Sequence, residues 1–298
     1  MPAAESVNKM AYRIFTDATS DLTLEMLNGL PKVEIIPMQV RINDQDYTYG
    51  PYGNLPTPVF YDLQRQGHFA KTSQINPQTY HYYFNRALMQ GMDVLYLGFS
   101  SGMSGCMQSA NICAEELKEK YPERKIICID TMCAAVGEGF LVLEAAKRQA
   151  EGMGIDDLAK WIADNRMNVC HWFTVDTFEH LKHGGRVSAA SAAVGTMLGI
   201  KPMLHVDDVG KLAVIEKPRG NKKAMEALLK QMDAGWMPGF GQRVIIGHGD
   251  DWDKARLLEA EVSKKFPNAE IQLAYIGPII GAHTGPGMLA LIYWGNNR

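Results

Sequence analysis

The chain has 298 residues, of which 46% are hydrophobic and 21% are charged, as is ordinary for one large or two medium-sized globular domains. Its net charge of −3, without a basic block, lacks the electrostatic signature of a nucleic-acid-binding protein, and we expect at most transient contact with a membrane. No leader-like stretch opens the sequence and no segment is expected to span a bilayer, so it predicts a cytoplasmic protein.

Strands and helices alternate along the first half of the sequence. An apolar run around Ile14 predicts a buried strand, and Asp21 or Thr23 would begin a short helix after it. Two further strand-then-helix pairs are predicted at residues 93–98, 105–119, 125–130 and 134–149. Apolar strands followed by helical crossovers predict an α/β domain with a mostly parallel sheet.

The second half has a more mixed pattern. A hairpin is predicted around the sequence DDVG, residues 207–210, because apolar runs flank this turn signal. The other predicted elements cover residues 156–166, 169–175, 176–183, 243–247, 253–266 and 271–275. We place a boundary near residue 160, which divides the chain into an N-terminal α/β domain, residues 10–160, and a C-terminal mixed α/β domain, residues 161–298.

Several familiar catalytic and cofactor motifs are missing. The loop FSSGMSG, residues 99–105, follows a strand and precedes a helix, but it lacks the Lys-Ser/Thr pair of a phosphate loop and the glycine spacing of a dinucleotide fingerprint. A serine hydrolase would need Ser101 or Ser104 beside His283 and an acid such as Asp176. The five cysteines form no C-x-x-C pair and the histidines show no metal-like spacing, so we expect neither a metal nor a cofactor.

Four polar stretches lie at the ends of predicted elements: KTSQ, SSGMSG, HGGRVS and GAHTGPG. Loops at the carboxyl ends of strands meet where open α/β sheets bind ligands. One arginine among neutral donors favours a single carboxylate over a polyphosphate, which would recruit lysines or a metal. We expect GAHTGPG, residues 281–287, to be a glycine-rich surface loop. The candidate ligand-binding residues are Thr72, Ser73, Ser104, Arg186, His283 and Thr284.

From about Tyr12 to Trp294 the sequence resembles the DegV family, whose fatty-acid-binding subunits of bacterial fatty acid kinase are often called FakB. The motifs that carry this resemblance are, in order, TDATSDL, KTSQ, SSGMSGCMQSA, DTMCAAVGEG, FTVDTFEHLKHGGRVS and IGPIIGAHTGPG. The resemblance implies two α/β domains with a lipid site between them. It also implies that the family's carboxylate-binding positions correspond to Thr72, Ser104, Arg186 and His283.

The function that this resemblance implies is lipid binding without catalysis. Such a protein buries one long-chain fatty acid and presents its carboxylate to a separate ATP-binding kinase subunit, which makes an acyl phosphate for phospholipid synthesis. Two alternatives remain open, a serine hydrolase acting on acyl esters and a lipid-free sensor or phosphocarrier domain. The chain departs from the family pattern at Ile75, Cys106 and Met107, and we expect these departures to affect acyl-chain preference.

Overall fold

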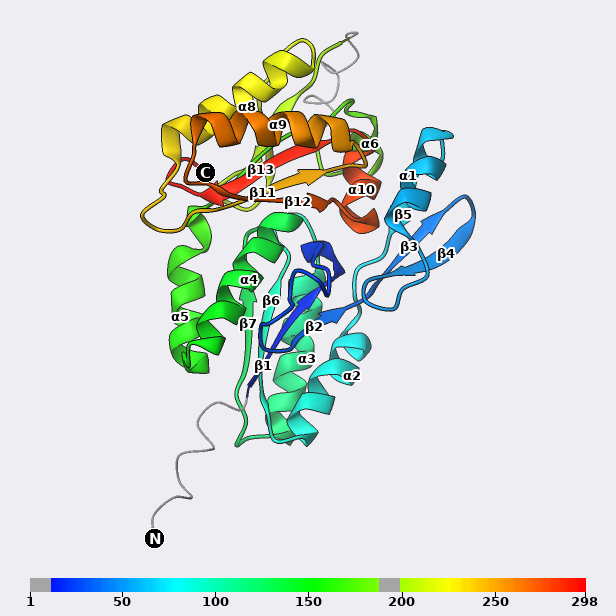
Figure 1. Ribbon diagram of the computed structural model, residues 1–298. Coiled ribbons are helices and arrows are strands. Elements are labelled where there is room, and N and C mark those ends of the chain that lie inside the picture. The colour runs from blue at the N-terminus through cyan, green and yellow to red at the C-terminus, as the bar shows by residue number, and fades with distance from the viewer. Residues whose placement is uncertain (1–11, 188–198) are drawn as a thin grey trace.

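The computed structural model describes residues 12–187 and 199–298, and in this part of the chain three sheets are formed (Figure 1). The first sheet is parallel, with the strand order β2-β1-β6-β7. Its strands are β1 (Tyr12–Asp17), β2 (Val33–Ile36), β6 (Asp93–Gly98) and β7 (Ile126–Asp130). The two central strands, β1 and β6, are almost entirely buried because helices cover both faces, which explains why they appear in the sequence as continuous apolar runs.

Alternate residues of the parallel strands face different helices. On one face, Phe15 and Tyr96 pack in a cluster with α2 (Pro77–Met89) and α3 (Cys106–Lys120). On the other, Ile14 and Leu95 pack in a cluster with α4 (Val136–Ala150) and α5 (Ile155–Asn165). This two-residue period is that of a strand with both faces in the core.

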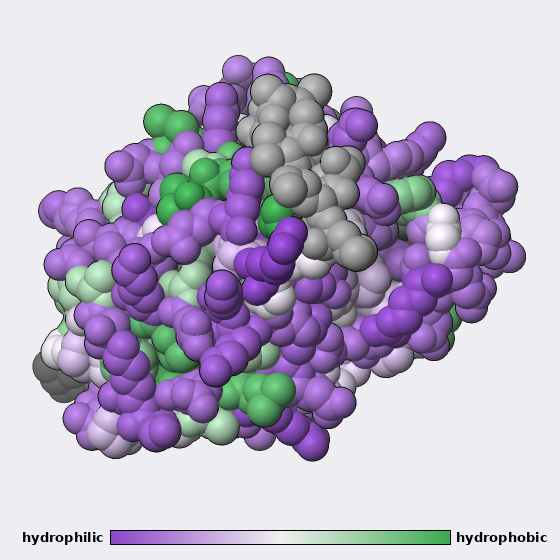
Figure 2. Space-filling model, turned by 90° about the horizontal axis from the view of Figure 1, so that it is seen from above, coloured by the Kyte–Doolittle hydropathy of each residue, from purple (hydrophilic) through white to green (hydrophobic). Residues whose placement is uncertain are grey.

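The second sheet is mixed, with the strand order β10-β9-β8-β13-β11-β12. Its strands are β8 (Val169–Thr174), β9 (Met203–Val206), β10 (Leu212–Glu216), β11 (Arg243–His248), β12 (Glu270–Tyr275) and β13 (Leu289–Trp294). β11 and β12 are parallel and joined through α9 (Trp252–Lys265), whereas the other neighbouring strands are antiparallel. α8 (Asn221–Gly235) and α9 cover its outer face, and this side of the molecule is mostly hydrophilic with small hydrophobic groups (Figure 2).

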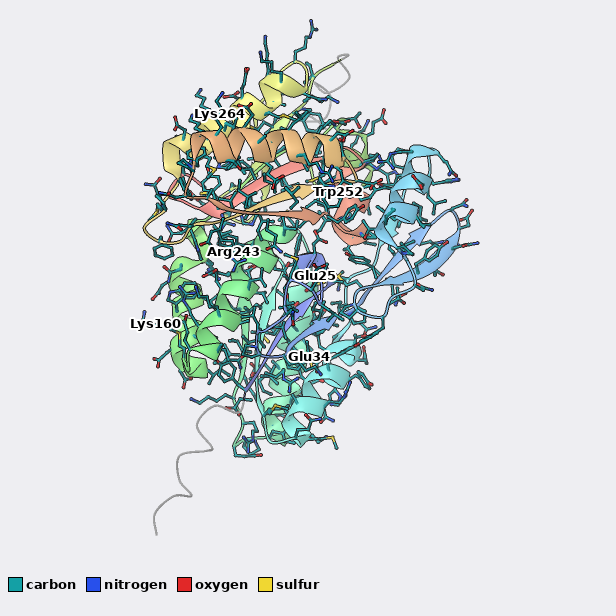
Figure 3. All side chains as sticks on the ribbon, in the orientation of Figure 1. Glu25, Glu34, Lys160, Arg243, Trp252 and Lys264 are labelled. Atoms are coloured by element: carbon teal, nitrogen blue, oxygen red, sulfur yellow. The ribbon has the colours of Figure 1, made fainter. Side chains whose placement is uncertain are left out.

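Helix α4 lies between the two sheets (Figure 1). It contacts β6 of the parallel sheet and β8, β11 and β13 of the mixed sheet, and residues 136–146 of it are all buried. Where α4 meets the mixed sheet (Figure 3), Arg243 Nε lies 3.1 Å from the carboxylate of Glu144, which also pairs with Arg148 at 3.0 Å. The result is a five-layer α/β/α/β/α arrangement in which α4 is the central layer.

A small antiparallel sheet stands beside these layers with α1 (Thr57–Arg65) (Figure 1). Its strands are β3 (Met38–Ile42), β4 (Gln45–Tyr49) and β5 (Lys71–Thr72). Sequence analysis identified none of these elements. The sheet matters for function because β5 carries the first half of the KTSQ stretch.

The structure confirms the predicted fold class, a parallel N-terminal sheet with helical crossovers and a mixed C-terminal sheet. The helix predicted to begin at Asp21 or Thr23 is wrong, since a 3-10 helix, η1 (Ala18–Ser20), precedes this point and residues 24–29 form turns. The predicted surface loop GAHTGPG is also wrong, because its first half belongs to α10 (Pro278–Thr284) and is mostly buried.

The division near residue 160 stays a prediction, and its first domain was predicted to begin at residue 10, outside the described residues. Ser188, at the end of the HGGRVS stretch, also lies outside them. Among the residues that the structure describes, none of the helices has the length and hydrophobicity needed to cross a bilayer.

Candidate functional site

A cavity of about 260 Å³ lies between the carboxyl ends of the parallel strands and the inner face of the mixed sheet. The loops that follow β6 and β7 contribute Met103 and Ala134, and the mixed sheet contributes Phe173 and Ile292. Most of its wall is apolar, as in small-molecule sites that hold one ligand by burial and a few polar groups. All six candidate residues lie on this wall: Thr72, Ser73, Ser104, Arg186, His283 and Thr284.

Thr72 and His283 form a hydrogen-bonded pair on the wall. Thr72 ends β5 and His283 lies in the last turn of α10, and the Thr72 hydroxyl is 2.9 Å from His283 Nε2. Burial, together with the positive charges of Arg186 and His183, lowers the pKa of His283 to about 4. The imidazole is therefore neutral at neutral pH. If its Nε2–H donates to Thr72, the threonine hydroxyl is free to donate its own proton to a ligand.

Arg186 and Ser104 lie at the mouth of the cavity. Arg186 follows the short helix α6 (Glu179–His183), and its exposed guanidinium donates to the carbonyl oxygens of Gly184 and Met103. Ser104 precedes α3, and its hydroxyl oxygen accepts a hydrogen bond of 3.3 Å from the amide of Cys106 in the first turn. A guanidinium and a helix N-terminus close to one opening favour an anionic group there.

Ser73 and Thr284 are less available to a ligand. The Ser73 side chain is exposed, and its amide donates to the carbonyl oxygen of Gln39 at 3.2 Å. The hydroxyl of Thr284 donates to the carbonyl of Ile280 at 3.2 Å, inside α10. Thr284 therefore contributes mainly its methyl group and its backbone to the wall.

Three glycines of the polar stretches are required because other parts of the protein pack closely against them, and no ligand is needed to explain them. A Cβ added at Gly184 would lie 2.1 Å from His283 Nδ1, and one at Gly105 would lie 2.5 Å from Gln74 Oε1. At Gly102 the added atom would meet the carbonyl oxygen of Gly210, 2.6 Å away at the tip of the β9–β10 hairpin. Close backbone approach therefore fixes the mouth of the cavity before any ligand binds.

A comparison with known families identifies the chain. The family model described as "Uncharacterised protein, DegV family" matches residues 11–296. The chain belongs to the DegV family. A DegV domain-containing protein of Clostridium perfringens, CPE0026, is 37% identical over 96% of this chain and 98% of its own length.

Solved DegV structures share the fold over almost the whole chain. A DegV protein from Thermus thermophilus, whose structure is described by its fatty acid binding, is 30% identical with a TM-score of 0.85, over 96% of this chain and 100% of that one. DegV from Bacillus subtilis, described as a fatty acid binding protein, is 28% identical with a TM-score of 0.81, over 95% of this chain and 98% of that one.

The three departures from the DegV sequence pattern directly follow the wall residues Gln74 and Gly105 in the sequence. Ile75, Cys106 and Met107 are buried in the core cluster that packs α2 and α3 against the parallel sheet. None of them lies on the described cavity wall. Any effect on acyl-chain preference would therefore act through the neighbouring wall residues, and it stays a prediction.

Sequence reasoning missed three polar residues on the cavity wall of this DegV protein: Thr19, Gln74 and His171. Gln74 lies two residues after Thr72 in the KTSQ stretch and Thr19 lies in TDATSDL, so these two motifs could have indicated both residues. His171 lies in none of the motifs identified in the sequence. It lies in a buried strand, with Nδ1 donating to the carbonyl of Val169 at 2.8 Å.

The residues considered for a serine hydrolase do not assemble into a triad. Asp176 pairs with Lys201 at 2.8 Å and with Lys254 at 3.1 Å, and the described partner of His283 is Thr72. A triad needs the histidine between the serine and the acid. No group of three or more possible metal ligands is found among the described residues.

Proposed function

We propose that this DegV protein binds one long-chain fatty acid, with the acyl chain in the cavity and the carboxylate beside Thr72, Ser104 and His283. The observation that carries the proposal is the Thr72–His283 pair on the wall of a mostly apolar cavity. The fatty acid binding named for the relatives from Thermus thermophilus and Bacillus subtilis supports the same ligand class.

The register of the mixed sheet gives the direction of the acyl chain. Leu289 pairs with Thr174 near α10, and Ile292 pairs with His171 three residues further along. Strands rise about 3.3 Å per residue, so the wall extends roughly 10 Å beyond the head-group end. The chain would therefore run along the inner face of β8 and β13, toward His171 and Ile292.

The energetics fit a tightly held lipid. Burying each methylene contributes roughly 0.8 kcal/mol, so a chain of about 16 carbons gains on the order of 10 kcal/mol before ordering costs. A buried carboxylate without partners would cost several kcal/mol. The hydroxyl groups of Thr72 and Ser104 offset this cost, and they fix which end of the lipid lies at the mouth.

We further propose that the protein is a non-catalytic subunit that presents the carboxylate to a separate ATP-binding fatty acid kinase. A kinase must reach the carboxylate. Arg186 is exposed and lies on the cavity wall, which supports a charged end of the proposed site that a partner can reach. The acyl chain would meanwhile remain between the sheets. The sequence resemblance to FakB subunits supports this partner.

Extraction of the purified protein tests the binding proposal. Mass spectrometry of organic extracts should find one straight-chain fatty acid, close to one molecule per chain, because the cavity offers one head-group end. Protein stripped of lipid should bind an added fatty acid again. If native protein yields no acyl chain and stripped protein binds none, the proposed function is wrong.

Replacing Arg186 with alanine should weaken acid binding by about 1 kcal/mol, roughly fivefold, because an exposed guanidinium is screened by solvent. A neutral acyl alcohol of the same length should lose much less. Lys182→Ala is the matched control, since Lys182 is exposed on α6 and is not on the cavity wall. Equal losses for acid and alcohol would assign Arg186 to packing alone.

A further inference from the structure

Two buried carboxyl groups meet at one hydroxyl beneath the cavity. Thr19 of η1 lies on the cavity wall, and its Oγ1 is hydrogen-bonded to Asp17 Oδ1 and lies 2.7 Å from Glu138 Oε2. Asp17 ends β1, Glu138 lies in the first turn of α4, and both are completely buried. The second oxygen of Glu138 accepts a hydrogen bond of 2.8 Å from Thr16.

Counting protons around Thr19 shows that one carboxyl group is neutral. A hydroxyl group carries one proton and can donate to one acceptor. With both carboxyl groups ionised, one of the two contacts would place oxygen lone pairs against each other at hydrogen-bond distance. The second contact is satisfied when a protonated carboxyl donates to Thr19, and Thr19 donates its own proton to the other carboxylate.

The donors around each carboxyl group show which one keeps the proton. When Thr19 donates to Asp17, the Asp17 carboxylate accepts three hydrogen bonds, the others being 2.9 Å from the amide of Thr19 and 2.6 Å from the hydroxyl of Tyr96. An ionised Glu138 would accept two. The N-terminus of α4 favours charge on Glu138, but a charge-assisted hydrogen bond is generally the larger contribution.

We propose that Glu138 is a positioning residue that stays protonated at neutral pH and donates this proton to hold Thr19 in the cavity wall. The chain of donors then runs from Glu138 to Thr19 and from Thr19 to Asp17. It carries one negative charge instead of two. Every hydroxyl and carboxyl proton in it has a defined acceptor.

The surroundings of Glu138 agree with this assignment. The titratable groups that face it are Asp17, Asp21, Tyr96 and Cys133. Among residues 12–187 and 199–298, no lysine, arginine or histidine hydrogen-bonds to either carboxyl of the pair or to Asp21. Burial raises the pKa of Glu138 well above its usual value, and the negative charge of Asp17 raises it further.

The segment that carries Thr19 is connected to the helix of the head-group site. Asp21 follows η1, and its Oδ1 accepts a hydrogen bond of 2.9 Å from the amide of Gly277, the residue that precedes α10. Ionisation of Glu138 would set two carboxylates against Thr19 beside the cavity. Resting on the proposed function, we therefore expect bound fatty acid to be lost when the pH rises through the pKa of Glu138.

Infrared spectroscopy of the full chain tests the protonation state directly. At neutral pH the wild-type protein should show the C=O stretching band of a buried protonated carboxyl, shifted by deuterium oxide. Glu138→Gln should remove the contribution of one carboxyl group from this band, whereas Asp17→Asn and Asp21→Asn should leave that contribution in place. Glu144→Gln is the matched control and should also retain it, because Glu144 lies on the same helix but is paired with Arg148 and Arg243. A wild type without the band, or a contribution removed by Asp17→Asn and not by Glu138→Gln, would overturn the proposal.

The pH dependence of stability is a second measurement that does not require lipid binding. The folded state holds the Glu138 proton after the unfolded chain has released it, so stability falls as pH rises between the unfolded and folded pKa values. In this window the folding equilibrium constant of lipid-free wild type should fall about tenfold more per pH unit than that of Glu138→Gln. The same pH dependence of stability in the wild type and in Glu138→Gln would contradict the proposal. The extracts could contain no lipid while the infrared band and the pH dependence of stability are both observed. In that case the proposed function is wrong and the assignment of the proton to Glu138 stands.

Discussion

Gly137→Ala is expected to lower the free energy of unfolding by about 3 kcal/mol, although alanine normally stabilises a helix by roughly 1 kcal/mol relative to glycine. A Cβ at this position in α4 would lie 2.0 Å from His171 Nε2 and 2.3 Å from Cδ2. The His171 ring cannot move away easily, because it is 2% exposed and its Nδ1 is bonded to the carbonyl of Val169. Urea denaturation at neutral pH measures the effect.

Gly239→Ala is the matched control for this substitution. Gly239 is exposed, and an added Cβ would have no atom within 4 Å. The free energy of unfolding should therefore change by no more than about 0.5 kcal/mol in Gly239→Ala. In a His171→Ala background the cost of Gly137→Ala should largely disappear, because the atoms that clash are gone. A Gly137→Ala protein as stable as the wild type would mean that the His171 ring is not held as described.

His283→Ala is expected to weaken fatty acid binding by roughly 1.5 to 3 kcal/mol, or about tenfold to over a hundredfold. The imidazole orients the Thr72 hydroxyl across a distance of 2.9 Å. Removing the imidazole therefore removes one polar group from the site and leaves the Thr72 hydroxyl free to rotate. Because α10 is a buried helix and not a surface loop, we also expect a lower melting temperature. Titration calorimetry with a fatty acid and its alcohol measures the two affinities.

A double-mutant cycle with Thr72→Val separates this interaction from general damage. If the pair acts together, the two losses should fall short of additivity by about 0.5 to 3 kcal/mol. His81→Ala is the control, since His81 lies on α2 and is not on the cavity wall. Fully additive losses, or the same loss for acid and alcohol, would mean that Thr72 and His283 do not form a common head-group site.

Much of the fold could be predicted from sequence because buried parallel strands produce continuous apolar runs. β6 and β7 were found in this way, and so were the hairpin of β9 and β10 and the β11–α9–β12 unit. Two-residue β5 and five-residue β4 are too short and too polar to give such a signal. Their pairing with β3 depends on tertiary contacts.

Helix α10 shows why part of the site could not be predicted. Its residues, PIIGAHT, contain a glycine and lead into GPG, so they resemble a loop. Two distant contacts favour the helix: Asp21 accepts from the amide of Gly277, and a Cβ at Gly281 would lie 2.6 Å from the hydroxyl of Tyr61. The candidate residues were predicted from polar stretches at the ends of elements, and the family resemblance supported four of them. The contact between Thr72 and His283, 211 positions apart, became visible only in the structure.

The central position of α4 restricts how the molecule can move. The cavity lies between two sheets, and a hinge motion that separates them is the simplest way to open it to a lipid. Such a motion would separate α4 from one of the two sheets and expose part of a helix whose residues 136–146 are all buried. It would also break either the Glu138–Thr19 hydrogen bond or the Glu144–Arg243 ion pair. Displacing residues 182–187 at the mouth, most of which are already exposed, uncovers less apolar surface. Lipid exchange by local opening at the mouth is therefore favoured over separation of the two halves.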